Sequence, residues 1–438
     1  MRCAWILAAM PVIVAVVSAC LLSPMAAAVP PPAHATSVVI FPFENTGHAG
    51  EMDWLGEGLS ELAIERLDGH GLTIFTREER LDALEKLGLP AYAHFSRATM
   101  LKIAAEIDAD YVIFGEYSAD GSHLELTARV LRVSPPKLSN AIAESGALEG
   151  LPQMGTQVAW QALCGIQDSL EDSGSCSADS AAGREFLAGA AGIRLDAFQF
   201  YVRGLISADD ETRLRDLRQA AQLQPDWDEP LLMLGRDYYA KRDCEPALQW
   251  LAKVAPTGPH ASEANFDAGV CYLLRNDPVR AESAFSAVHV GAQASANGSA
   301  DNPAVASNLG AALLRQARYK EAIADFERAL RLDPGEPDYE FNEGLGKYLT
   351  GDWPAAIEAL REAWRLEPND AQIKALLIAS LDHSGKADEA SALRAQGAAP
   401  AAGTQDATPP RRDMAKLDPT SLARLARVRM VFGAGAAQ

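Results

Sequence analysis

The stretch LGAALLRQARYKEAIADFERALRLDP, residues 309–334, decides how most of this chain folds. Apolar side chains recur in it at helical spacing, with the small residues Gly310 and Ala322 among them and Pro334 at its end. Small residues let two antiparallel helices approach closely, and a proline after the second helix cannot continue it. The stretch therefore predicts a pair of packed helices.

The same arrangement recurs along the chain, led each time by a glycine. Gly235 and Gly269 are 34 residues apart, as are Gly310 and Gly344, and 41 residues separate the middle two. An alanine follows each glycine after twelve positions, and a leucine or phenylalanine follows after sixteen. These are Ala247, Ala281, Ala322 and Ala356, and then Leu251, Phe285, Phe326 and Leu360. A period of 34 residues predicts a stacked array of helix pairs.

This pattern resembles the tetratricopeptide repeat family. The resemblance implies an all-α superhelical solenoid in which the first helix of each pair lines a concave surface that binds a protein or peptide. Within an array spanning residues 194–396, the expected units are a degenerate repeat without the glycine at 194–227, full repeats at 228–261, 262–302, 303–336 and 337–370, and a partial repeat at 371–396. The second full repeat carries a loop insertion at 291–302.

Candidate partner-binding residues are those on the first helices that fall outside the packing positions. Aromatic and arginine side chains on an open groove suit a peptide or a partner helix. The alternative is that some of them complete the core between repeats. The candidates are Arg236, Tyr239, Phe266, Arg315, Phe341 and Tyr348.

Residues 37–170 have a different pattern, in which short runs rich in β-branched and aromatic residues alternate with helical spacing. The strands are expected near 37–43, 72–76, 111–117, 124–131 and 142–147, and the helices near 55–67, 81–87, 98–107 and in a segment ending about 170. Asp120-Gly121 between the third and fourth strands indicates a hairpin. The order predicts an α/β domain with a mixed sheet.

Three segments of this region, residues 39–45, 54–59 and 110–115, occur in an order that resembles the TolB amino-terminal-like family, and FlgO-like envelope domains are similar. The resemblance implies an interaction module without known chemistry, often joined to tetratricopeptide repeats in bacterial envelope proteins.

The first residues predict export. A short basic start precedes an apolar run over residues 4–22, which is typical of a signal sequence or an anchor. Cleavage before a lipid-bearing Cys20, with 1–19 as the lipoprotein signal, competes with cleavage after Ala28, and an uncleaved anchor is a third reading. Residues 29–36 then form a proline-rich tether. Each reading places the folded chain in the periplasm, free or anchored to the membrane.

Export would expose the remaining cysteines to an oxidising compartment. Cys164 and Cys176 flank a polar loop, and Cys244 and Cys271 fall at helix ends expected to lie side by side in the array. Each pair is a possible disulfide, and the alternative is that each thiol is a small buried apolar group. Clusters of cysteine and histidine at metal-binding spacing are lacking, so we expect no metal.

Charge and motifs favour binding over catalysis. The chain has 59 acidic and 39 basic residues, and a net charge of −20 opposes nucleic acid as a partner. Gly56-Glu57-Gly58 stands where a phosphate loop would begin, but the negative Glu57 and Asp53 favour a tight helix start instead. Histidines fall singly and no Gly-x-Ser-x-Gly motif occurs, so we expect neither an enzyme nor a cofactor.

Three further segments lie outside the two predicted domains. Residues 171–193 are expected to be a linker, residues 397–418 a flexible one, and residues 419–432 a basic amphipathic helix that docks on this protein, on a partner or on a membrane.

The sequence thus predicts a non-catalytic scaffold of the bacterial cell envelope. The alternative is an envelope sensor or regulator whose α/β domain binds a small ligand or glycan.

Overall fold

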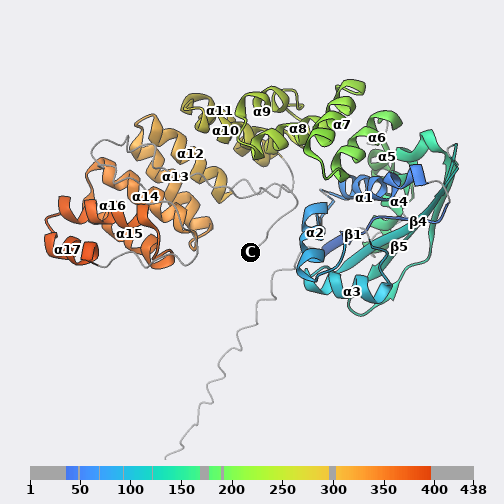
Figure 1. Cartoon of the computed structure of the whole chain (residues 1–438), viewed down its shortest axis with the longest axis horizontal. Helices are drawn as coiled ribbons and strands as arrows, with labels where there is room; N and C mark the ends of the chain where they lie inside the picture. Colours follow the sequence, from blue (N-terminus) through green and yellow to red (C-terminus); the bar gives the residue numbers. More distant parts are fainter. Residues whose placement is uncertain are drawn as a thin grey trace, which may run out of the picture. The chain divides into compact units, whose positions relative to one another are not determined.

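A computed structural model gives the fold and describes residues 36–47, 50–68, 70–91, 93–120, 122–167, 177–188, 192–294 and 302–395. The described part begins with a mixed sheet and its helices and continues as helix pairs (Figure 1). This confirms the predicted fold class of an α/β region followed by an all-helical repeat region.

The sheet has the strand order β3-β1-β4-β5-β6, with β2 paired to β4 and β7 paired to β5. Parallel pairs join β1 to β3 and to β4, whereas β4, β5 and β7 pair in antiparallel fashion. The strands are β1 (Thr36–Ile40), β2 (Glu44–Asn45), β3 (Leu72–Ile74), β4 (Tyr111–Ala119), β5 (His123–Arg132), β6 (Lys137–Leu138) and β7 (Ile142–Ala147). The hairpin signal at Asp120-Gly121 is therefore matched by the β4–β5 pairing around it.

Both faces of the sheet are covered by helices. Alternate residues of β1 point to opposite faces, as the pleat of a strand requires, so that Val38 and Ile40 join one core and Val39 another, which also contains Phe41 just after the strand. Helices α1 (Trp54–Leu67) and α4 (Leu151–Ile166) cover the first face, and α2 (Arg77–Lys86) and α3 (Arg97–Glu106) the second (Figure 1). Two short 3-10 helices, η1 (Gly50–Met52) and η2 (Leu148–Gly150), precede α1 and α4.

A further helix lies inside the range predicted as the linker 171–193. Helix α5 (Ala181–Ala188) buries Phe186, whose ring centroid lies 5.3 Å from that of Trp160 on α4. The linker prediction is wrong at these residues because one aromatic side chain was enough to fix a short helix against the α/β core.

Six helix pairs follow. They are α6 (Leu195–Ile206) with α7 (Asp210–Leu223), α8 (Asp228–Ala240) with α9 (Cys244–Leu251), α10 (Ala261–Leu274) with α11 (Pro278–Ala294), α12 (Pro303–Arg315) with α13 (Tyr319–Leu332), α14 (Pro337–Thr350) with α15 (Trp353–Leu366), and α16 (Ala371–His383) with α17 (Ala387–Ala395). The segment expected to be a partial repeat, 371–396, thus contributes a helix pair.

The recurring glycines allow the two helices of a pair to touch. A Cβ atom on Gly310 would lie 2.6 Å from a ring carbon of Phe326, and one on Gly344 would lie 2.7 Å from Leu360, far inside van der Waals contact. Gly235 faces Leu251 and Gly269 faces Phe285 in the same way. Each glycine therefore opposes the large residue sixteen positions later, and the intervening alanines are fully buried.

The first helix pair also has such a glycine, contrary to the prediction for 194–227. A Cβ atom on Gly204 would lie 2.8 Å from Leu217. Gly204 precedes Leu217 by only thirteen residues, because α6 ends three residues sooner after its glycine than α8 does. A shift of three residues is close to one helical turn, so Gly204 lies on the same face of its helix as the other repeat glycines do. Its distance from Gly235, however, is not 34 residues.

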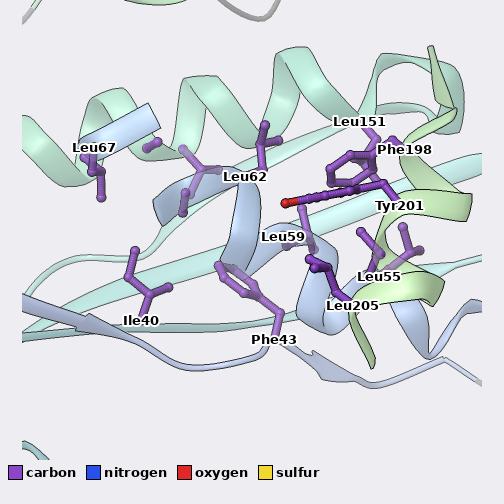
Figure 2. Close-up of a cluster of buried hydrophobic side chains, with 14 of the residues drawn as sticks. Ile40, Phe43, Leu55, Leu59, Leu62, Leu67, Leu151, Phe198, Tyr201 and Leu205 are labelled. Atoms are coloured by element: carbon purple, nitrogen blue, oxygen red, sulfur yellow. The ribbon is translucent and has the colours of Figure 1, made fainter. Parts of the chain in front are cut away.

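Helix α1 joins the sheet region to the repeats. Phe198 and Tyr201 of α6 lie against Leu55 and Leu59 of α1 in one continuous hydrophobic cluster (Figure 2). A Cβ atom on Gly58 would lie 3.1 Å from the Phe198 ring, so the glycine permits this close approach. The α/β region and the first repeats therefore share a core.

Candidate functional site at the first helices and the adjoining cavity

The first helices of the pairs form a continuous row. Helix α8 contacts α10, α10 contacts α12, α12 contacts α14, and α14 contacts α16. Each of these helices also packs against its own second helix and against the second helix of the preceding pair. A binding surface on the repeats therefore has to be built from the side chains that this packing leaves accessible.

Two of the six predicted binding residues are not accessible. Phe266 on α10 is 3 % exposed, and Phe341 on α14 is completely buried. The prediction that they lie on an open face is wrong because a first helix has neighbours on several sides, so aromatic positions outside the glycine pattern also enter the core.

Arg315 and Tyr348 are partly buried and take part in contacts between repeats. The Arg315 guanidinium donates a hydrogen bond of 2.5 Å to the carbonyl oxygen of Leu273, near the end of α10. That carbonyl belongs to the last turn of the helix, where intrahelical donors run out. The Tyr348 ring lies edge-on to His383 on α16, with 5.6 Å between centroids.

Arg236 and Tyr239 on α8 are also partly buried. Arg236 pairs with Glu263 on α10 at 3.3 Å, and Tyr239 packs beside the sulfur-rich cluster of Cys244 and Cys271. Of the predicted set, Arg236 is the residue that also lines the cavity described below.

One of the two predicted cysteine pairs is joined in the structure. Cys244 at the start of α9 and Cys271 on α10 form a disulfide, with 5.2 Å between their Cα atoms. Cys164 is buried on α4, whereas Cys176 and Cys20 lie outside the described residues, so the second disulfide and the lipid anchor stay predictions.

The Gly56-Glu57-Gly58 segment holds an internal ion cluster. Glu57 is 6 % exposed and pairs with Arg77, at 2.9 Å, and with Arg80. Arg80 is itself buried and donates a 2.6 Å hydrogen bond to the carbonyl oxygen of Ile40. A buried carboxylate bound by two guanidiniums ties α1 to α2 and β1, so this segment contributes to the packing of the sheet region.

A cavity of about 840 Å³ lies where α1 and α2 face α6, α8 and the start of α10. Trp160 from α4 and Phe186 from α5 contribute to its wall, as do Phe198 and Tyr201 from α6. Eight carboxylates but only three guanidiniums are among its lining groups, so the cavity is acidic.

Two carboxyl groups from different regions of the chain interact in this cavity. Burial, and then the charge of Glu229 on α8, raise the pKa of Glu65 on α1 to about 8. Burial also acts to raise the pKa of Glu229, but hydrogen bonding and charge from His260, 3.4 Å away, lower it overall. The pair therefore shares one proton near neutral pH, with Glu229 ionised and Glu65 protonated.

Glu61, one turn before Glu65 on α1, also lines the cavity. Its Oε1 atom is buried without a hydrogen-bond partner in the described part of the chain. Burial, and then the nearby charge of Glu57, raise the pKa of this carboxyl to about 7. Unmatched buried oxygens of this kind cost free energy unless a donor reaches them.

No group of three or more histidine, cysteine or acidic side chains among the described residues could hold a metal ion. No helix among the same residues has both the length and the apolar character that crossing a bilayer requires.

Comparison with known proteins supports the repeat assignment. Residues 232–299 and 304–336 match family models described as Tetratricopeptide repeat. The chain therefore contains tetratricopeptide repeats, which agrees with its glycine pattern and its helix pairs. Repeats of this family act as scaffolds for protein interactions, so they indicate a protein or peptide partner.

One curated relative is Interferon-induced protein with tetratricopeptide repeats 2 from Cricetulus griseus, 35% identical over 60 residues. The match spans 13% of this chain and 13% of that protein's length.

Three solved structures are also similar over part of the chain. A crystal structure of MamA protein is 20% identical, covering 38% of this chain and 88% of that one, with a TM-score of 0.35. The MamA RS-1 ArsTM double mutant is 23% identical, with 40% and 97% covered and a TM-score of 0.37. YrrB, titled a TPR protein with an unusual peptide-binding site, is 16% identical, with 40% and 88% covered and a TM-score of 0.35.

Proposed function

We propose that this protein is a non-catalytic scaffold of the bacterial cell envelope that binds a partner protein along its first helices. The row of first helices from α8 to α16 is the observation that carries the proposal. Such a row presents a long preformed surface, so a partner can bind without the cost of ordering it. Tyr239 and Tyr348 remain partly accessible on this row and are the aromatic anchors proposed.

The disulfide supports the envelope location. A bond between Cys244 and Cys271 persists in an oxidising compartment and is rarely stable in a reducing cytosol. The apolar run at residues 4–22, outside the described residues, supplies the export signal in this proposal. Mass analysis of the mature N-terminus distinguishes a lipid on Cys20 from cleavage after Ala28.

Site-specific photo-crosslinking in cells tests the binding face. A crosslinking amino acid is placed at Tyr239 or Tyr348 on the first helices, or at the exposed Lys320 on the second helix α13 as the control. We expect one discrete adduct from the first two positions and none from Lys320. The proposal fails if Lys320 alone gives the adduct, or if all three positions give none.

The acidic cavity favours a second candidate, a sensor whose α/β domain binds a small ligand. The cavity lies beside the shared core of α1 and α6, so an occupant would contact both the sheet region and the repeats. A ligand that binds one arrangement of these elements more tightly than another would transmit its presence to the repeats.

A further inference from the structure

We infer that the cavity between α1, α2, α6, α8 and α10 is a binding site for an organic cation, an ammonium or guanidinium group carried on an apolar body. The inference gives the second candidate function, on which it rests, a chemical class of ligand. Its test needs no partner protein, so its failure leaves the scaffold proposal standing.

The first step is that each guanidinium group lining the cavity already has a carboxylate partner. Arg66 pairs with Glu65, and Arg236 pairs with Glu263 at 3.3 Å. Arg77 pairs with Glu57 at 2.9 Å. None of these guanidiniums forms a hydrogen bond with the Oε1 atom of Glu61 in the described structure, so a donor for this atom has to come from elsewhere.

The second step is that the other carboxylates near Glu61 have partners of their own. Glu79 accepts the backbone N–H of Thr76 at 2.7 Å in a capping box at the start of α2. Glu229 lies 3.4 Å from His260. The buried Oε1 atom of Glu61 therefore stands out as an acceptor that needs a donor from outside the described chain.

The third step concerns the wall of the cavity. The rings of Trp160 and Phe186 lie 5.3 Å apart between centroids, and Phe198 and Tyr201 line the same space. Aromatic rings attract cations by their negative faces and also bury apolar carbon, so they suit the body of an organic amine. A volume of about 840 Å³ is in the range of cavities that hold small molecules.

Binding of an organic cation is coupled to the ionisation of the carboxyl groups in the cavity. Without a cation, burial and the charges of Glu57 and Glu78 keep the Glu61 carboxyl protonated below about pH 7, although Arg80 and Arg77 act against them. Glu65, Glu229 and His260 line the same cavity and share protons among themselves. An arriving cation favours the carboxylate form, so binding at pH 6 should release protons.

The test is isothermal titration calorimetry on the purified full-length protein at pH 6 to 8. The probes are phenethylamine and agmatine as free cations, acetyl-Gly-Lys-Gly-amide as a basic side chain within a peptide, and 2-phenylethanol as the neutral counterpart of phenethylamine. We expect at least one cation to bind with one-to-one stoichiometry, and 2-phenylethanol to bind at least tenfold more weakly. Whether a free amine or the peptide binds identifies the source of the cation.

The variants locate the binding. Glu61→Gln keeps the shape of the carboxyl group but cannot take a negative charge, and we expect it to weaken cation binding at least tenfold. Glu106→Gln, on the exposed surface of α3, is the matched control and should bind as the unaltered protein does. Equal binding by the two variants, or no binding of any cation at 10 mM, would overturn the inference.

A second readout does not depend on a variant. Repeating the titration of the unaltered protein at pH 6 in buffers of different ionisation enthalpy gives the number of protons exchanged. We expect net release of protons on binding. Proton uptake, or no exchange, would show that the cation binds away from the protonated carboxyls and would equally overturn the inference.

Discussion

The glycines of the repeats matter because they have no side chain. Gly310 lies so close to Phe326 that even one added carbon would overlap the ring, and the carbonyl oxygen of Ala322 would be 3.0 Å from it. Overpacking of this kind typically costs about 1–3 kcal/mol, while an alanine in a helix gains up to about 1 kcal/mol over glycine. We therefore expect the steric cost of the added carbon to exceed the gain in helix propensity.

The first prediction follows from this difference. Gly310→Ala should lower the free energy of unfolding by about 1–2 kcal/mol, as measured by hydrogen exchange of α12 and α13. Gly165→Ala is the matched control, because nothing lies within 4 Å of the Cβ position on Gly165 in α4. It should leave stability unchanged or raise it. Equal effects of the two substitutions would contradict the packing account.

The second residue-scale prediction concerns the pH dependence of stability through Glu61. Its pKa is raised from 4.5 to about 7 in the folded protein, so the folded state holds a proton that the unfolded state releases. This contribution to stability is complete below about pH 4.5 and is lost as the pH rises through about 7.

The side chain of the Glu61→Gln variant cannot ionise, so the variant should not lose this contribution to stability as the pH rises. Relative to the unaltered protein, the variant should gain stability as the pH rises from 5 to 8, approaching a difference of about 2–3 kcal/mol. Denaturant unfolding at several pH values, followed by tryptophan fluorescence, measures the difference. A constant difference across this range would show that Glu61 ionises normally.

At the scale of elements, the disulfide joins the α8–α9 pair to α10. It links residues 27 apart in sequence, and a loop of that length is expected to contribute about 3 kcal/mol. Reduction should therefore increase hydrogen exchange in α9 and α10. A Cys244→Ser, Cys271→Ser variant should show the faster exchange in α9 and α10 without reductant, and these two helices should not respond further to reductant. Exchange that reductant leaves unchanged in the unaltered protein would argue against a stabilising disulfide.

The elements also show what the sequence could and could not predict. Gly235 and its counterparts predicted the helix pairs because glycine and the large residue opposite it lie within one pair, at a fixed spacing. Phe266 and Phe341 were misplaced because a single stripe of apolar residues was assumed, whereas each first helix is packed on several sides. Gly204 was missed because a shortened α6 moved it out of the period.

The cavity had no local signal at all. Glu61 and Glu65 look like ordinary charged residues of an amphipathic helix, and Glu229 lies more than 160 residues further on. Their meeting depends on the contact between α1 and α6, which only the folded chain reveals. The Phe186 helix was hidden in the same way, since its ring contacts are with Trp160 and His70, which lie far from it in the sequence.

At the scale of the whole molecule, we propose different tasks for two regions of one chain. The repeats supply a row of first helices for a partner protein, and the sheet region supplies one wall of an acidic cavity that the first repeats complete. Both regions use the same packing device, a glycine at the point of closest approach between two helices, as at Gly310 within a repeat and at Gly58 between α1 and α6.

The affinity for the crosslinked partner tests the central claim most directly. Once that partner is identified, its dissociation constant is measured for the unaltered protein and for variants of each face. The account predicts that Tyr239→Ala and Tyr348→Ala together weaken binding at least tenfold, whereas Lys320→Ala on α13 leaves it within twofold. Loss of binding in the Lys320→Ala variant, with the tyrosine variant unaffected, would contradict the claim that the first helices hold the partner.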